Sequence, residues 1–204
     1  MDFSLKNFTW TRPPKSFEVT QEAVKIITDP NTDLWQRTYY HFQNDNAPVL
    51  QMETEEKFFS FTVKTRFSTE HLYDQCGIVM YLDSENWLKA SIEYENEEFQ
   101  HLGSVVTNRG FSDWATTEIP GNVRSMWYRL SRRADDFRVE CSDDGIHFRQ
   151  LRVCHLYAAT GDVTFGIYAC SPEDSSFKAT FTHMELTECQ WPAHDGQPPD
   201  DADV

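Results

Sequence analysis

The sequence has few cations. Its 18 Lys and Arg residues are outnumbered by 33 Asp and Glu among 204 residues, and the formal net charge is −15. Affinity for a phosphate backbone needs clustered cations, so this balance argues against a nucleic-acid partner. An acidic excess is typical of a soluble, well-solvated surface. An acid-rich site for cations and a basic protein partner stay open as alternatives.

Long apolar runs are also missing. The N-terminal MDFSLKNFTW has no cationic segment followed by an apolar one, and no stretch approaches the ~20 apolar residues of a membrane span. The five cysteines are widely spaced, odd in number and without a CxxC pair, which is typical of reduced thiols rather than disulfides or a zinc site. We expect a cytoplasmic protein that does not contact a membrane.

Recognisable catalytic motifs are absent as well. The sequence contains no GxSxG, P-loop, GxGxxG or HExxH, and no two of its seven histidines are four residues apart. We therefore expect no metal and no cofactor, and a binding protein rather than an enzyme.

What the sequence does contain is alternation of apolar and polar residues, the pattern of strands with one buried face. It is clearest over residues 58–65, 75–82, 87–94, 125–131, 137–141, 147–153, 163–170 and 178–187. With weaker segments we count about eleven or twelve strands and no helix. This predicts an all-β fold, a two-sheet antiparallel β-sandwich of the jelly-roll type, as one domain over residues 1–189. Residues 190–204 are polar, acidic and rich in proline, which predicts a disordered tail.

The most informative stretch is residues 83–114, which holds two strands on either side of an acidic turn. From residue 87 to 94 the apolar positions face the core, and Trp87, Lys89 and Glu93 share the other face. The polar turn at residues 83–86 joins this strand to residues 75–82 as a hairpin. The alternation of residues 75–82 places Gln75 and Tyr81 on the same face of the sheet as Lys89 and Glu93.

Four strands combine an apolar face with a face of large aromatic or charged groups. Aromatic planes with a few fixed polar groups suit sugar recognition. We predict a carbohydrate site on a concave sheet face, formed by Gln75, Tyr81, Trp87, Lys89, Glu93, Trp127, Arg129 and Tyr168, with the loop tip Ser112, Asp113 and Trp114 as one wall. The alternative is that a loop or the N-terminal arm covers this face and the aromatics form a satellite core.

The glutamates at positions 93, 95 and 97 offer a second interpretation. Carboxylates on one strand face resemble the acid and nucleophile of a glycosidase, with Glu93 acting beside Glu95 or Asp113. We favour solvated turn charges, and an ion pair of Glu93 with Lys89, because a nearby cation lowers a carboxyl pKa. A third interpretation is a protein-interaction module that uses the acidic turn or the tail.

Residues from about 8 to 188 resemble the regulation-of-enolase family, a domain of unknown function with a concanavalin A-like sandwich. The matching stretches are DLWQRTYYHF, YDQCGIVMYLDSENWLKASIEYE, GSVVTNRGFSDWAT, WYRLSRRADDF, CSDDGIHFRQLR and GDVTFGIYACSP. The resemblance implies a two-sheet jelly roll with a saccharide-type concave face, and a cytoplasmic protein that affects enolase, with enolase as a partner. The acidic cluster departs from the glutamate-aspartate-glutamate signature of concanavalin-like glycosidases, because Tyr94 and Asn96 intervene, and this argues against hydrolysis.

Overall fold

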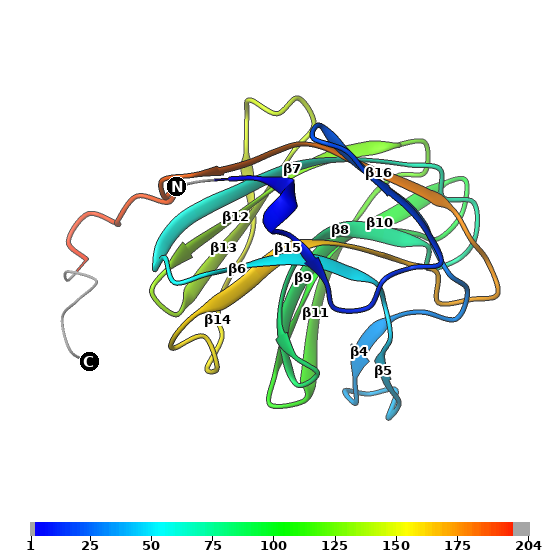
Figure 1. Ribbon diagram of the computed structural model, residues 1–204. Coiled ribbons are helices and arrows are strands. Elements are labelled where there is room, and N and C mark those ends of the chain that lie inside the picture. The colour runs from blue at the N-terminus through cyan, green and yellow to red at the C-terminus, as the bar shows by residue number, and fades with distance from the viewer. Residues whose placement is uncertain (1–2, 198–204) are drawn as a thin grey trace.

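The computed structural model describes residues 3–197, and most of them form two seven-stranded antiparallel sheets packed face to face (Figure 1). The order of the first sheet is β1 (Thr9–Trp10), β6 (Val49–Thr54), β15 (Val163–Cys170), β8 (Gln75–Asp83), β9 (Asn86–Tyr94), β10 (Phe99–Asn108) and β11 (Phe111–Pro120). The order of the second sheet is β14 (Arg149–His155), β13 (Asp136–Ser142), β12 (Ser125–Arg133), β7 (Phe58–Phe67), β16 (Lys178–Thr187), β3 (Ala23–Ile27) and β2 (Ser16–Val19). The predicted antiparallel β-sandwich is confirmed.

The core lies between the sheets and is formed by the apolar positions of the alternating strands. In β9, Leu88, Ala90 and Ile92 are each 1 % exposed. Aromatic rings contact one another across the two sheets, with the ring centroids of Phe61 and Phe165 4.9 Å apart. Because successive side chains of a strand alternate between faces, burial of these residues turns Lys89 and Glu93 to the other side of the first sheet. We call that side the outer face.

The register of β8 and β9 confirms the predicted hairpin. Gln75 lies opposite Glu93, Val79 opposite Lys89, and Tyr81 opposite Trp87. Since residues directly opposite each other in an antiparallel pair share a face, the polar residues of both strands point to the outer face.

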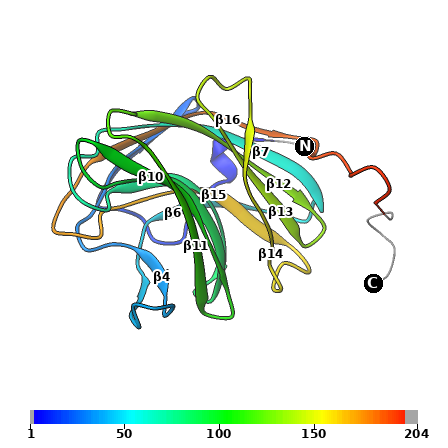
Figure 2. The same cartoon turned by 180° about the vertical axis from the view of Figure 1, so that it is seen from behind.

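A small hairpin of β4 (Leu34–Gln36) and β5 (Gln43–Asp45) covers part of this outer face. In both Figure 1 and Figure 2 it projects from the same side of the sandwich as one end of β9–β11. Its apolar side packs on the sheet in a second buried cluster, formed by Leu34, Trp35, Ala47, Val49, Val79, Tyr81, Trp87, Val105, Tyr168 and Cys170.

The loop of this hairpin differs from the extended strand that the composition of residues 33–42 suggests. Only three residues of that stretch are in β4, and Arg37, Tyr39 and His41 adopt positive φ angles of 57°, 64° and 62°. Non-glycine residues with positive φ are uncommon and cost free energy, so three within five residues require support from the surroundings. The Arg37 guanidinium supplies part of it by donating to the Gly110 carbonyl at 2.8 Å.

The ends of the chain add little to the sheets. Leu5–Asn7 form a single 3₁₀ turn, and within residues 3–197 no helix is long and apolar enough to cross a membrane. At the start of the predicted tail, the Gln190 backbone donates to Ser60 Oγ at 2.8 Å and the Trp191 carbonyl accepts from Arg133 at 2.6 Å. Residues 198–204 of that tail lie outside the described residues. All five cysteines are free thiols, as expected.

Candidate functional site

A pocket of about 330 Å³ lies between the outer face of the first sheet and the β4–β5 hairpin. Its volume is within the roughly 300–1,000 Å³ typical of small-molecule sites. The lining side chains combine aromatic and polar groups from distant parts of the sequence: Asp33, Trp35, Tyr40, Phe42, Asn44, Tyr73, Gln75, Lys89, Ser91, Glu93, His101, Gly103, Ser104, Val105, Trp114, Pro172 and Glu173.

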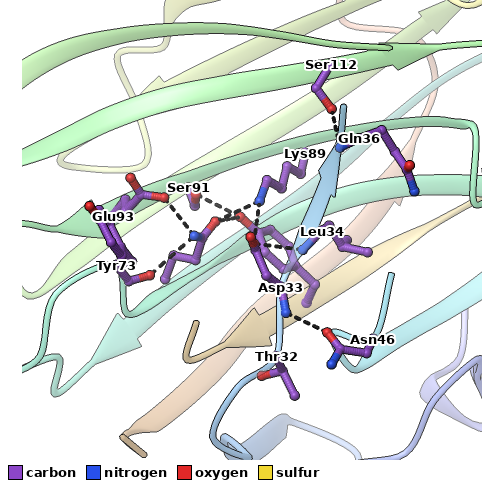
Figure 3. A network of polar contacts seen from close by, with 12 residues as sticks. Thr32, Asp33, Leu34, Gln36, Asn46, Tyr73, Lys89, Ser91, Glu93 and Ser112 are labelled. Atoms are coloured by element: carbon purple, nitrogen blue, oxygen red, sulfur yellow. Dashed lines mark hydrogen bonds and ion pairs between the residues drawn. The ribbon is translucent and has the colours of Figure 1, made fainter. Parts of the chain in front are cut away.

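The floor of the pocket is a hydrogen-bond network centred on the Gln75 amide. Figure 3 shows Lys89, Glu93 and Tyr73 among the residues of this network. Gln75 Oε1 accepts from Lys89 Nζ at 3.0 Å and from the Tyr168 hydroxyl at 2.9 Å, while Nε2 donates to Glu93 Oε2 at 2.7 Å and to the Tyr73 carbonyl at 3.2 Å. Both ends of the amide are thus occupied by partners that fix its orientation. A network whose members are all bonded holds its side chains in one arrangement.

Lys89 is a buried cation, with only 4 % of its surface exposed. Its ammonium lies 3.4 Å from Asp33 Oδ1 and 5.5 Å from the centre of the Tyr168 ring. Asp33 also accepts from the Leu34 backbone at 2.7 Å, so the start of β4 holds this carboxylate over the sheet. A buried charge needs a partner, and Asp33 provides it.

Glu93 is a carboxyl whose pKa is shifted by this environment. Burial raises the pKa of its carboxyl from 4.5 to about 7, the Lys89 ammonium counteracts the rise, and Asp33 and Glu95 add to it. The expected ion pair between Glu93 and Lys89 is therefore wrong: Lys89 pairs with Asp33, and Glu93 accepts from Gln75. The alternation of residues 87–94 does not indicate how deeply this carboxyl is buried.

Aromatic side chains form the walls. The Trp35 ring meets Trp114 and Tyr40 edge to face, with centroids 6.3 Å and 5.3 Å apart, and Tyr40 stacks on Phe42 at 5.7 Å. Trp114 remains 39 % exposed. The buried Trp35 Nε1 has no hydrogen-bond partner among the described residues. An unmatched buried donor is costly, because it loses its hydrogen bonds to water without replacing them.

One end of the pocket is lined by His101 and Glu93, and Glu95 lies against His101 beside it. His101 on β10 lies directly opposite Glu93 in the β9–β10 register. Its Nδ1 is 2.8 Å from Glu95 Oε1, just beyond the end of β9. Glu95 is partly buried and contacts His101, whereas Glu97 is exposed, so the three glutamates do not line one face together.

The predicted site residues fall into four groups. Gln75, Lys89, Glu93 and Trp114 line the pocket as expected. Tyr81, Trp87 and Tyr168 share the outer face but lie beneath the β4–β5 hairpin, at 6 %, 0 % and 0 % exposure. For these three the satellite-core alternative is correct, although the Tyr168 hydroxyl still orients Gln75.

The Ser112–Trp114 segment is not a loop tip but the first part of β11. Ser112 Oγ accepts from the Gln36 backbone at 2.9 Å and ties the hairpin to the sheet. Asp113 alternates to the opposite side of the strand and pairs with Arg152 of the second sheet at 2.6 Å. Of this segment only Trp114 reaches the pocket.

Trp127 and Arg129 are also misplaced by the prediction. Both lie on β12 in the second sheet, where Trp127 packs against His183 at 4.9 Å and Arg129 bonds Glu140 at 2.7 Å. They line a separate hollow that is more open to solvent. Alternation places a side chain on one face of its strand, but it does not identify the sheet.

Sequence reasoning missed Asp33, Trp35 and His101. The first two reach the pocket because the β4–β5 hairpin folds over residues far along the chain. His101 could have been found by extending the 87–94 alternation across the acidic turn, which places it opposite Glu93.

The comparisons with known proteins agree with this architecture. Residues 10–189 match the model of a family described as "Protein of unknown function (DUF1349)". The chain belongs to this family. Over 185 residues, 90 % of each chain, it is 37 % identical to Regulation of enolase protein 1 of Saccharomyces cerevisiae. The predicted resemblance is confirmed.

Solved structures show where this family's fold recurs. A functionally unknown protein from Saccharomyces cerevisiae superposes with a TM-score of 0.84 at 34 % identity, over 91 % of this chain and 98 % of that one. The GH43 BlXynB protein from Bacillus licheniformis gives a TM-score of 0.69 at 17 % identity. This chain covers 37 % of the BlXynB chain, and the likeness shows a shared fold.

Proposed function

We propose that the pocket on the outer face binds a neutral, hydroxyl-rich ligand the size of one or two sugar rings, and that the protein acts without catalysis in the regulation of carbon metabolism. The observation that carries the proposal is the pairing of aromatic walls, above all Trp35 and Trp114, with the fixed polar floor of Gln75 and Glu93. Sugar rings present C–H faces to aromatic planes and hydroxyls to polar groups.

The charge of the pocket favours a neutral ligand over a phosphorylated one. Lys89 lines the pocket, but its ammonium is already paired with Asp33 and hydrogen-bonded to Gln75. The carboxyls of Glu93 and Glu173 also line the pocket. A phosphate would meet these acids without a free cation, whereas hydroxyls can donate to carboxylates.

Pre-organisation supports ligand binding as well. The Gln75 network fixes the floor before any ligand arrives, so little free energy is spent on ordering it. The unmatched Trp35 Nε1 provides a donor that a sugar oxygen would satisfy.

The metabolic role rests on the family. The yeast relative is named Regulation of enolase protein 1, and the identity extends over 90 % of both chains. We therefore infer a role in the regulation of enolase for this chain, with the occupied pocket as the signal and enolase as a partner.

A thermal-shift screen tests ligand binding, because a ligand that binds only the folded state raises its apparent stability. The panel contains neutral mono- and disaccharides, polyols and phosphorylated glycolytic intermediates. We expect a neutral saccharide to raise the melting temperature of the parent protein by more than that of Trp114→Ala at the same ligand concentration. Stabilisation by phosphorylated compounds alone would refute the charge argument.

One observation favours a second function, a glycoside-modifying enzyme. The pKa of about 7 raised by burial suits Glu93 to donate a proton near neutral pH. Glu95 is the nearest candidate for the second carboxylate, whereas Asp113 is on the other side of β11 and paired with Arg152. Turnover of aryl glycosides by the parent and its loss in Glu93→Gln would establish this alternative, and no turnover in the parent would remove it.

A further inference from the structure

Glu93, Glu95 and His101 form a cluster of metal-binding side chains at one end of the pocket. Each offers one donor atom, and the three atoms lie within 4.8 Å of one another. All three side chains are partly buried. Protein ligands bind Zn²⁺ at roughly 2.0–2.2 Å, so small side-chain rotations would bring these atoms around one ion.

The contact between His101 and Glu95 is short but poorly directed. Nδ1 lies 2.8 Å from Glu95 Oε1, yet this buried nitrogen has no hydrogen bond of acceptable geometry among the described residues. An N–H that cannot align with its acceptor gains little from the short distance. The His101 nitrogen and the Glu95 oxygen therefore lie close together without a well-directed hydrogen bond between them. A metal ion that binds both atoms suits this arrangement better.

The charges around this cluster also favour a bound cation. Glu93 and Glu95 lie together, and the nearby Lys89 is paired with Asp33 rather than with either of them. Glu93 Oε2 accepts from Gln75, which is a neutral donor. When both carboxyls are ionised they repel each other, and a divalent ion bound between them reverses the sign of that interaction.

The type of donor selects the class of metal. One imidazole nitrogen with carboxylate oxygens suits zinc and related first-row ions, whereas calcium and magnesium prefer oxygen alone. Gln75 also holds Glu93 in place from behind, as outer partners do at metal sites.

We propose that Glu93, Glu95 and His101 bind one divalent transition-metal ion, with its remaining coordination positions open to the pocket. Three protein ligands with an open position are typical of zinc sites that also bind a small molecule. This inference goes beyond the proposed saccharide binding and does not depend on it.

The test uses the full chain, treated with EDTA, dialysed and titrated with Zn²⁺ by calorimetry near neutral pH. We expect one tight site per chain, weakened at least about tenfold (~1.4 kcal/mol) in His101→Asn and in Glu95→Gln. The matched controls are His155→Asn and Glu97→Gln, whose exposed side chains lie outside the pocket and should leave the affinity unchanged.

Two further measurements keep the test decisive. Thermal melts in EDTA show whether each variant folds, and a variant that does not fold is replaced by His101→Gln or Glu95→Ala. Absorption of the Co²⁺ complex reports whether a cysteine thiolate is a ligand. Absence of binding, equal affinity in the site and control variants, or thiolate ligation would each overturn the proposal. Because the metal is titrated alone, its failure leaves saccharide binding standing.

Discussion

Gln75 Nε2 donates a 2.7 Å hydrogen bond to Glu93 Oε2 from the position directly opposite it in the β8–β9 hairpin. The same amide accepts from Lys89 on its other side. One neutral side chain therefore separates a buried cation from a carboxyl with a raised pKa, and holds both at the floor of the pocket.

Replacing Gln75 with leucine tests the stabilising part of this network. Lys89 would keep Asp33 and the Tyr168 hydroxyl would keep Ser91, but Lys89 would lose the Gln75 acceptor and Glu93 would lose the Gln75 donor. A hydrogen bond to a charged group contributes about 1.5–3 kcal/mol to stability. We expect the midpoint of urea unfolding to fall clearly. Gln21→Leu, at an exposed position of the β2–β3 turn, serves as the control. Equal midpoints for the two variants would contradict the structural role of Gln75.

The raised pKa of Glu93 predicts how the stability of the metal-free protein depends on pH. Its folded-state pKa of about 7 lies above the ordinary 4.5, so the folded protein holds this proton more tightly. The resulting stability is complete below pH 4.5 and is lost as the pH rises through 7, at about 1.4 kcal/mol for each unit of pKa difference.

The variant Glu93→Gln removes this titration while its amide oxygen can still accept from Gln75. In EDTA we expect it to match the parent near pH 5 and to melt at a higher temperature near pH 8. Glu97→Gln, at an exposed position, should shift neither melt. A parent whose stability relative to Glu93→Gln rises between these pH values would show the opposite sign and contradict the burial of Glu93.

Two tryptophans of the predicted site lie on different sheets of the sandwich. Trp114 lines the pocket, whereas Trp127 lies on the second sheet. Loss of one aromatic contact is worth about 0.5–1.5 kcal/mol, so Trp114→Ala should weaken saccharide binding about threefold to tenfold. Calorimetric titration of Trp127→Ala should give the parent affinity. A larger loss of affinity for Trp127→Ala than for Trp114→Ala would place the saccharide site on the second sheet.

Trp35→Phe isolates a single hydrogen-bond donor. Because Trp35 Nε1 has no partner among the described residues, its removal breaks no hydrogen bond of the folded protein, and any loss of stability comes from the smaller ring. Binding of a saccharide should weaken, since phenylalanine keeps an aromatic ring but cannot donate. Unchanged affinity, measured by the same titration, would show that the ligand does not use this donor.

The sequence predicted the fold and the centre of the site through simple alternation. Leu88 and Ile92 face the core, which turns Lys89 and Glu93 outward, and the polar turn before Trp87 pairs this strand with the one that carries Gln75. These are local relationships, set by strand geometry and one hairpin register.

The rest of the site depends on contacts between segments far apart in the sequence. The alternation of apolar and polar residues does not specify these contacts. Trp127 has the same pattern as Trp87, yet the two lie in different sheets. Tyr168 is closed off by a hairpin whose loop has three residues at positive φ, a conformation that no composition of strand-forming residues suggests. Asp33 reaches Lys89 only because that hairpin folds back over the sheet.

The most direct test of the central claim is a crystal structure of the full chain soaked with the neutral saccharide that gives the largest thermal shift. We predict electron density for a sugar ring against Trp114, with a hydroxyl within hydrogen-bond distance of Glu93 or Trp35 Nε1. A sugar bound only at the Trp127–His183 surface of the second sheet, or an empty pocket at saturating ligand, would contradict the account.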